Sequence, residues 1–340
     1  MWADPRGGAA YQFSSFGRLD VVTGTGVSTL SYSPEIRDVS MPTSTSAFAV
    51  GWNLFLARWN GQSWTVDKPP TGTPSVRILQ GVWSDGPNNA WAVGNSGTIL
   101  RWNGTSWSVV SDILHPVELG GPSYNAVWGS GSTVLIGGTS GILRCSTGSC
   151  ANDGAPPGGN LFGVCGTSTS NVFAVGAAGR ILHYNGTAWT PMTSPTSRTL
   201  VRAWGSGASD VWAVGDSVLL HYDGTAWKSV PMIGDLQHAQ SGVFSQFQGN
   251  VFQLGLWGSA ANDVYLGGDF GQIIRWNGTE WRQLRTGSGH RVVGIAGVPG
   301  FGAIAVLQAG TGFGSAGSIL RGLGPTGGMS TPMIPPASWP

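Results

Sequence analysis

The chain has 340 residues, of which 56 are glycine, 20 are proline and 17 are tryptophan, while only 10% are charged. Glycine is more than twice as common as its average of about 7%, yet aromatic residues are abundant, which excludes a collagen helix and a disordered chain. So many glycines and prolines also exclude a mostly helical protein, because both break helices. The composition indicates an all-β protein with many tight turns and extensive aromatic packing.

The net charge of +1 argues against nucleic acid and anionic membranes as partners. No run approaches 18 apolar residues, so we expect no membrane span. Residues 1–6 do not have the pattern of a signal peptide, so we expect no signal sequence in this chain. Three parts are expected in chain order: an N-terminal segment over 1–35, a repeat region over 36–321, and a tail rich in proline and glycine over 322–340.

One sequence unit recurs seven times in the repeat region. Its clearest copy reads Val-Trp-Ser at 82–84, Ala-Trp-Ala-Val-Gly at 90–94 and Ile-Leu-Arg-Trp-Asn-Gly at 99–104. A basic residue marks the register of each copy, and successive marks are 43, 43, 39, 38, 54 and 46 residues apart: Arg58, Arg101, Arg144, His183, His221, Arg275 and Arg321. Propeller blades repeat at about 40–50 residues with four strands each. The sequence therefore predicts a seven-bladed β-propeller of four-stranded antiparallel blades.

Closure of the ring needs a separate argument. The tail that follows Arg321 contains five prolines and makes a poor fourth strand for the last blade. The segment over 18–22 precedes the first blade. We expect it to complete the last blade and so cover an open sheet edge.

Fourteen of the 17 tryptophans fall at four fixed positions of the unit. The first position holds Trp83, Trp128, Trp204 and Trp257, and the second holds Trp91 and Trp212. The third holds Trp59, Trp102 and Trp276, and the fourth holds Trp64, Trp107, Trp189, Trp227 and Trp281. Both faces of a blade are covered by neighbouring blades, so these rings are expected mainly to pack between blades. A ring of tryptophans that stack on sugars is the alternative.

The third copy has cysteines where another copy has tryptophans. Cys145 and Cys150 align with Trp102 and Trp107 on either side of a four-residue loop, where facing residues have the spacing of a disulfide. We predict a Cys145–Cys150 bridge, with Cys165 buried and free, although two free thiols also fit the spacing. The bridge would place the protein in an oxidising compartment. Zinc is disfavoured, because no histidine or further cysteine pair stands at ligand spacing.

Catalytic patterns are missing from the sequence. No carboxylate pair stands out for glycoside hydrolysis, and there is no nucleophile elbow, zinc-protease motif or phosphate-binding loop. We expect neither a cofactor nor a metal. Asp or Asn recurs six residues after the first tryptophan position, and capping of the loop backbone is its simplest role: Asn89, Asn171, Asp210 and Asp263.

Two features remain as candidates for ligand binding. The basic residues of the repeat, Arg144 and Arg275 among them, either link neighbouring blades or form a basic ring for anionic sugars or carboxylates. The interval from Trp227 to Trp257 is 30 residues, against 15 from Trp189 to Trp204, and its extra stretch is either a binding lid or a tolerated insertion. Its polar candidates are Asp235, Gln237, His238, Gln240 and Gln246.

The pattern Val-Trp-Ala-Val-Gly, Gly-x-Ile-Leu-Arg and Asn-Gly-Thr-x-Trp resembles bacterial propeller repeats related to the Asp-box class. It is similar to the photosystem II assembly-factor propeller, to secreted myxobacterial propellers and to seven-bladed bacterial lectins. It differs from sialidases, since no arginine triad or Tyr-Glu pair is recognisable. The likeness spans residues of about 36–321 and is specific for architecture rather than function.

From this resemblance we expect a non-enzymatic recognition propeller that binds a glycan or a partner protein outside the cell or in the cell envelope. The alternatives are a glycan-active hydrolase or lyase with its site at the channel mouth, and a structural subunit of a larger surface assembly.

Overall fold

The computed structural model describes residues 10–13, 18–23, 26–31, 36–71, 73, 77–110, 121–215, 218–230, 254–268, 271–285, 291–299, 302–308 and 317–323. Within these ranges the regular structure is β-strand apart from two short 3₁₀ turns, η1 (Trp52–Leu54) and η2 (Ala177–Gly179). Neither turn, nor any other helix in the described ranges, has the length and apolar character needed to cross a membrane.

Six sheets have four antiparallel strands each, and consecutive strands are neighbours in every one. The first two blades consist of β4 (Ile36–Thr43), β5 (Ser46–Gly51), β6 (Leu56–Trp59) and β7 (Trp64–Val66), then β8 (Leu79–Gly86), β9 (Asn89–Gly94), β10 (Ile99–Trp102) and β11 (Trp107–Val109). The third and fourth consist of β12 (Tyr124–Ser130), β13 (Thr133–Gly138), β14 (Gly141–Cys145) and β15 (Cys150–Asn152), then β16 (Leu161–Ser168), β17 (Asn171–Gly176), β18 (Ile181–Tyr184) and β19 (Trp189–Pro191). The fifth and sixth consist of β20 (Leu200–Gly207), β21 (Asp210–Gly215), β22 (Val218–Tyr222) and β23 (Trp227–Ser229), then β24 (Leu256–Ala260), β25 (Asp263–Gly267), β26 (Gln272–Trp276) and β27 (Trp281–Arg285).

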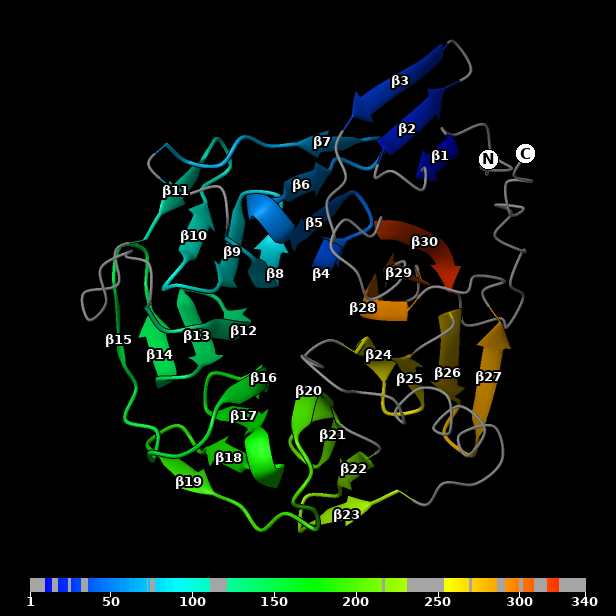
Figure 1. Cartoon of the computed structure of the whole chain (residues 1–340). Coiled ribbons are helices and arrows are strands. Elements are labelled where there is room, and N and C mark those ends of the chain that lie inside the picture. Colours follow the sequence, from blue (N-terminus) through cyan, green and yellow to red (C-terminus); the bar gives the residue numbers. More distant parts are fainter. Residues whose placement is uncertain are drawn as a thin grey trace.

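These sheets follow one another around a common axis, with the first strand of each innermost (Figure 1). The fold is therefore a β-propeller with four-stranded antiparallel blades, as the repeat predicts.

The last copy of the repeat forms a three-stranded sheet of β28 (Arg291–Val298), β29 (Gly302–Gln308) and β30 (Gly317–Leu323). One of its faces packs on the sixth blade, where Val292 and Ala305 join Tyr265 in a buried cluster. Its other face packs on the first blade, where Val293 and Val306 join Ile36 and Val39 in a second cluster. The C-terminal sheet thus lies between the sixth and first blades.

The segment expected to complete the last sheet pairs elsewhere, so that prediction is wrong. Strand β2 (Arg18–Thr23) is the middle strand of a separate sheet, between β1 (Ala10–Phe13) and β3 (Gly26–Ser31). Both of its edges are used by partners that are adjacent in sequence, which need only short loops. The small sheet lies at the outside of the ring (Figure 1), and its strand β1 contacts β30, the last strand of the C-terminal sheet.

Asn-Gly or Asp-Gly hairpins join the third and fourth strands, because the turn needs a left-handed residue that glycine adopts without strain. In the second blade Gly104 has φ +96°, and Asn103 Oδ1 accepts the backbone N–H groups of Thr105 and Ser106 at 2.9 and 3.0 Å. In the fifth blade Asp223 makes the same two bonds. These local bonds fix the register in which the residues on either side of the loop face each other.

The hydrophobic core is divided into clusters between successive blades. One cluster joins Leu135 and Ile142 of the third blade to Val172, Leu182 and Trp189 of the fourth, all less than 5% exposed. Each aromatic ring buried in this way removes about 150–250 Å² from water. The abundant tryptophan of the sequence therefore stabilises the contacts between blades.

Candidate functional site

The innermost strands enclose a channel along the axis of the ring. It has a volume of about 240 Å³ and is lined by residues of β4, β8, β12, β16, β20 and β28 and by residues in and just before β24. Each of these is the edge strand of its sheet, so the channel wall combines side chains with backbone groups that have no strand partner on that side. Every four-stranded blade and the C-terminal sheet contribute residues to the channel.

One repeat position, which we call the axial position, lies two residues before the first tryptophan position. Five copies have glycine or alanine there, one has an aspartate and one has an arginine. In chain order the residues are Asp38, Gly81, Ala126, Gly163, Arg202, Gly255 and Gly294. A β-bulge precedes the position in several inner strands, for example between Leu200 and Arg202. Because a bulge turns the strand and re-aims the next side chain, it sets the direction of Asp38 and Arg202.

Asp38 and Arg202 form an ion pair across the channel. Arg202 Nη2 donates to Asp38 Oδ1 at 2.9 Å, and the backbone N–H of Val82 donates to Oδ2 at 3.0 Å. The two side chains are only 12% and 16% exposed. Burial raises the pKa of Asp38, and the charge of Arg202 together with the hydrogen bonds opposes that shift. First and fifth blades are thereby joined through one charged contact.

Three half-buried tryptophans line the same channel: Trp128, Trp204 and Trp257. Each lies at the first tryptophan position, two residues beyond the axial position, and side chains two apart on a strand share one face. Trp128 lies against Gly166 of the next blade and Trp204 against Gly258, so closely that a Cβ on either glycine would come within 2.6 and 2.5 Å of the indole. A side chain at either glycine would therefore displace the indole packed on it.

Arg144 and Arg275 are both held in ion pairs. Arg144 bonds Asp153 through Nε at 2.5 Å and Nη2 at 2.9 Å, and Arg275 Nε bonds Asp263 Oδ1 at 2.7 Å. They lie on β14 and β26, in the third and sixth blades, so the fold does not bring them together (Figure 1). Arg144 also lies over the ring of Tyr184 in the fourth blade, 4.9 Å from its centroid, so its contacts hold its own blade and link it to the next.

The recurrent Asp and Asn residues also bind side chains. Asp210 accepts from His221 Nε2 at 2.6 Å, and Asn171 contacts His183 Nε2 at 2.7 Å. Asp263 likewise accepts from Arg275, so three of the four residues contact the basic residue of their blade, whereas Asn89 donates to the carboxylate of Asp85. The insertion that contains Asp235, Gln237, His238, Gln240 and Gln246 lies outside the described residues.

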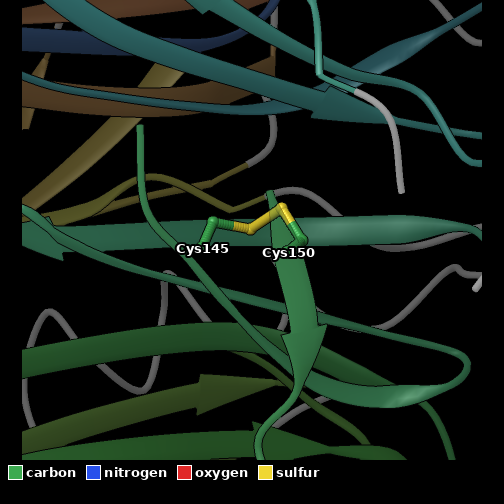
Figure 2. The surroundings of a disulfide bond; sticks show 2 residues. All are labelled: Cys145 and Cys150. Carbon is green, nitrogen blue, oxygen red and sulfur yellow. A yellow bond between two sulfur atoms is a disulfide. The ribbon is translucent and has the colours of Figure 1, made fainter. Parts of the chain in front are cut away.

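A disulfide joins Cys145, at the end of β14, to Cys150, at the start of β15 (Figure 2). The two residues face each other across the strands, as Trp102 and Trp107 do in the second blade. Both are 1% exposed. Cys165 is free and buried in the channel wall, and burial raises the pKa of its thiol to about 12.

Within the described ranges, no three His, Cys, Asp or Glu side chains come together in a way that could hold a metal ion. The channel presents a fixed cation, a fixed carboxylate and aromatic surfaces to a ligand. Sequence reasoning missed Asp38 and Arg202. Aligning the innermost strands of all copies would have revealed the pair. In that alignment, Asp38 and Arg202 are the two charged residues at a position that otherwise holds glycine or alanine.

A chain with these sheets around an axial channel belongs structurally to the β-propellers. No family model matches it, and no curated protein sequence does. Three solved structures resemble it: YCF48 bound to D1 peptide (TM-score 0.61, 20% identity, 82% of this chain and 90% of that one), the WD40 propeller domain of Doa1 (0.61, 11%, 87% and 93%) and YCF48 from Cyanidioschyzon merolae (0.56, 16%, 82% and 94%). At such identities the likeness establishes the propeller fold.

Proposed function

We propose that this chain is a non-enzymatic recognition propeller that binds its ligand at the axial channel. The observation that carries the proposal is the combination of Trp128, Trp204 and Trp257 with the Asp38–Arg202 pair in one cavity. Partly exposed aromatic surface beside a few fixed polar groups is typical of binding sites. The acids of the repeat support the absence of catalysis, because Asp153, Asp210 and Asp263 are engaged with basic side chains.

Two ligand classes follow from this proposal. A glycan fits aromatic surfaces with charged hydrogen-bonding groups, and it is our first candidate. A segment of a partner protein is the second, favoured by one similar structure, YCF48, which is bound to a D1 peptide. Both classes require access to the channel rather than to the outer strands.

We also propose that the C-terminal sheet is a seventh blade, because β28 lines the channel as the other inner strands do and both faces of the sheet are covered. An extracellular or cell-envelope location is proposed from the disulfide, since such bonds persist in oxidising compartments.

The function is tested by probing a glycan array and a peptide array with the intact chain. Trp257→Ala removes an indole from the channel, and Trp64→Ala removes an equally half-buried indole from β7, outside the channel lining. We expect binding to one array that is lost in Trp257→Ala and kept in Trp64→Ala. Equal loss in both variants, or turnover of a bound glycan, would contradict a channel-based recognition protein. A partner that co-purifies through the outer strands would instead support a structural subunit.

A further inference from the structure

We propose that the axial channel binds one neutral sugar ring, which Arg202 and Asp38 hold by hydrogen bonds and the channel indoles hold by stacking. This inference rests on the proposed recognition function and names the ligand of the same site. It follows from four properties of the channel: its size, its charge, its spare hydrogen-bonding capacity and the arrangement of its aromatic rings.

Size limits the ligand to a small one. Pockets for drug-sized molecules have volumes of about 300–1,000 Å³, and the channel has about 240 Å³. A single six-membered sugar ring, such as the terminal residue of a glycan, is on this scale. Five of the axial positions hold glycine or alanine and so add little side chain to this space; a Cβ on Gly294, for example, would lie 3.6 Å from Asp38 Oδ1.

Charge favours a neutral ligand. Asp38 and Arg202 are the charged residues among those that line the channel, and their charges offset each other. An anionic ligand that approached Arg202 would meet the carboxylate of Asp38, and a cationic ligand would meet the guanidinium. A polyol meets neither penalty, because each hydroxyl group can donate to a carboxylate and accept from a guanidinium.

Both members of the pair keep unused hydrogen-bonding capacity. A guanidinium has five N–H donors, and among the described residues Arg202 uses Nη2 toward Asp38. A carboxylate offers about four lone-pair sites, and Asp38 uses three of them, for Arg202 and the backbone N–H groups of Val82 and Val39. The pair can therefore present several donors and one acceptor to a ligand without breaking its own contact. Adjacent donors and acceptors of this kind match neighbouring hydroxyls on a sugar.

Aromatic surface lies beside these polar groups. Trp204 follows Arg202 by two residues on β20, so both side chains leave the same face of the strand toward the channel. The neighbouring blade contributes Trp257 at the same level. An indole packs well against the C–H face of a sugar ring, while the hydroxyls at the edge of the ring reach the ion pair.

Cys165 supplies a reporter for occupancy of the channel. It is the free cysteine of the three in the chain, and it occupies the first tryptophan position of the fourth blade, at the level of Trp204. Its pKa of about 12 makes its alkylation slow enough to follow by mass spectrometry. A molecule held in the channel should shield the thiol, and one bound elsewhere should not.

The test uses the intact, non-reduced chain and a panel of neutral methyl glycosides, with glucuronate as the charged comparison. Calorimetry measures affinity, and alkylation of Cys165 by N-ethylmaleimide measures channel occupancy. We expect at least one neutral glycoside to bind with one site per chain and to slow alkylation. Arg202→Met and Asp38→Asn should each weaken binding at least about tenfold, because each removes hydrogen bonds to a charged group. Arg282→Gln, which removes an exposed arginine from β27, should leave it unchanged.

Thermal melting checks that each variant folds, and Arg202→Lys, which keeps the charge but loses the planar fork, replaces Arg202→Met if that variant unfolds. Trp204→Phe keeps an aromatic face over Gly258 and should weaken binding less than the loss of Arg202. The proposal is overturned if no neutral glycoside binds, if binding leaves alkylation of Cys165 unchanged, or if glucuronate binds more tightly. Peptides that shield Cys165 where sugars do not would overturn the sugar and leave the recognition function standing. Failure of both ligand classes would overturn the two together.

Discussion

Arg144 and Asp153 form a two-point ion pair in the third blade, and the same carboxylate accepts the Nε1–H of Trp189 in the fourth blade at 2.7 Å. Asp67 repeats the arrangement between the first and second blades, with Arg58 and Trp107. One acid thus fixes a basic residue of its own blade and a tryptophan of the next. These contacts explain why charge persists in sheets that are otherwise apolar.

In five of the six four-stranded blades the basic residue pairs with a side chain at one of two repeat positions; in the second blade Arg101 instead donates to the backbone oxygen of Thr147 in the third blade. The outer position follows the fourth strand, and its backbone N–H donates to the third strand: Asp67, Val110, Asp153, Met192 and Val230. The inner position is the first residue of the second strand: Ser46, Asn89, Thr133, Asn171, Asp210 and Asp263. Blades with aspartate at the outer position have serine or threonine at the inner one. The first, third, fifth and sixth blades each supply one acid to the basic residue, and the second and fourth have asparagine at the inner position instead.

This exchange predicts that the acid can be moved within a blade. Asp153→Met should lower the free energy of unfolding by about 1.5–3 kcal/mol, because it removes charged hydrogen bonds to Arg144 and Trp189. Adding Thr133→Asp should recover much of the loss, since Arg144 can then pair with the inner position as His221 does with Asp210. The methionine would face Trp189 as Met192 faces Trp227 Nε1, at 3.4 Å. Urea unfolding of both variants gives the comparison.

Thr133→Asp alone is the control, because it adds an acid beside a basic residue that already has one. It should change stability less than it does in the Asp153→Met background. An equal effect in the two backgrounds would show that Arg144 does not choose between the positions.

Local pairing explains which features could be predicted from the sequence. The Cys145–Cys150 contact spans five residues and needs only the hairpin register, which the Asn-Gly hairpins of other copies reveal. Residues 18–22 form a strand, as predicted. Their pairing partner was predicted wrongly. The strand could either pair with the distant last sheet or form two short hairpins with its neighbours in sequence, and the residues of the strand alone do not indicate which pairing is more stable.

Long-range contacts explain what could not be predicted. Asp38 and Arg202 are 164 residues apart, and they meet because the first and fifth blades face the same axis. Both residues stand at a position that holds glycine or alanine in the other copies. The first blade, however, has Ser40 where other copies have a tryptophan, so the alignment of Asp38 with that position is hard to see in the sequence. The choice between inner and outer acids is similarly invisible in any single copy.

The glycines that contact channel tryptophans should resist substitution. Gly166→Ala would place a Cβ 2.6 Å from the indole of Trp128, so the ring or the backbone must move. We expect a loss of about 1–3 kcal/mol, as for other overpacked sites. Gly207→Ala is the matched control, because a Cβ there meets nothing within 4 Å. Thermal melting compares the two, and equal melting temperatures would show that Trp128 does not pack tightly on Gly166.

The ion pair in the channel should make stability depend on pH in a specific direction. Burial raises the pKa of Asp38 above 3.8, despite the opposing charge of Arg202. Between pH 3.8 and the higher native value, the folded state holds a proton that the unfolded chain has released, so the free energy of unfolding falls as pH rises. Asp38→Asn should remove this part of the pH dependence. Urea unfolding from below pH 3.8 to neutral pH measures the difference between variant and parent.

Asp210→Asn supplies a control of opposite sign. Burial alone would raise the pKa of Asp210, but hydrogen bonds from His221 and Ser206 outweigh it and lower the pKa below 3.8. Its contribution to stability is therefore complete above pH 3.8 and is lost as pH falls through the native value. If both substitutions changed the pH profile in the same direction, the opposite environments assigned to the two carboxylates would be wrong.

The disulfide should be replaceable by the aromatic pair that other blades use. Closing this short loop is worth about 2 kcal/mol in the chain-entropy model, so Cys145→Ser with Cys150→Ser should lose about that much. Cys145→Tyr with Cys150→Trp should recover a large part, because Tyr184 and Trp189 occupy the same places in the fourth blade with ring centroids 5.3 Å apart. The aromatic variant should also melt identically with and without reductant. Alkylation of three thiols in the non-reduced parent would show that the bridge does not form, and the serine variant would then cost only the packing of the two buried sulfur atoms.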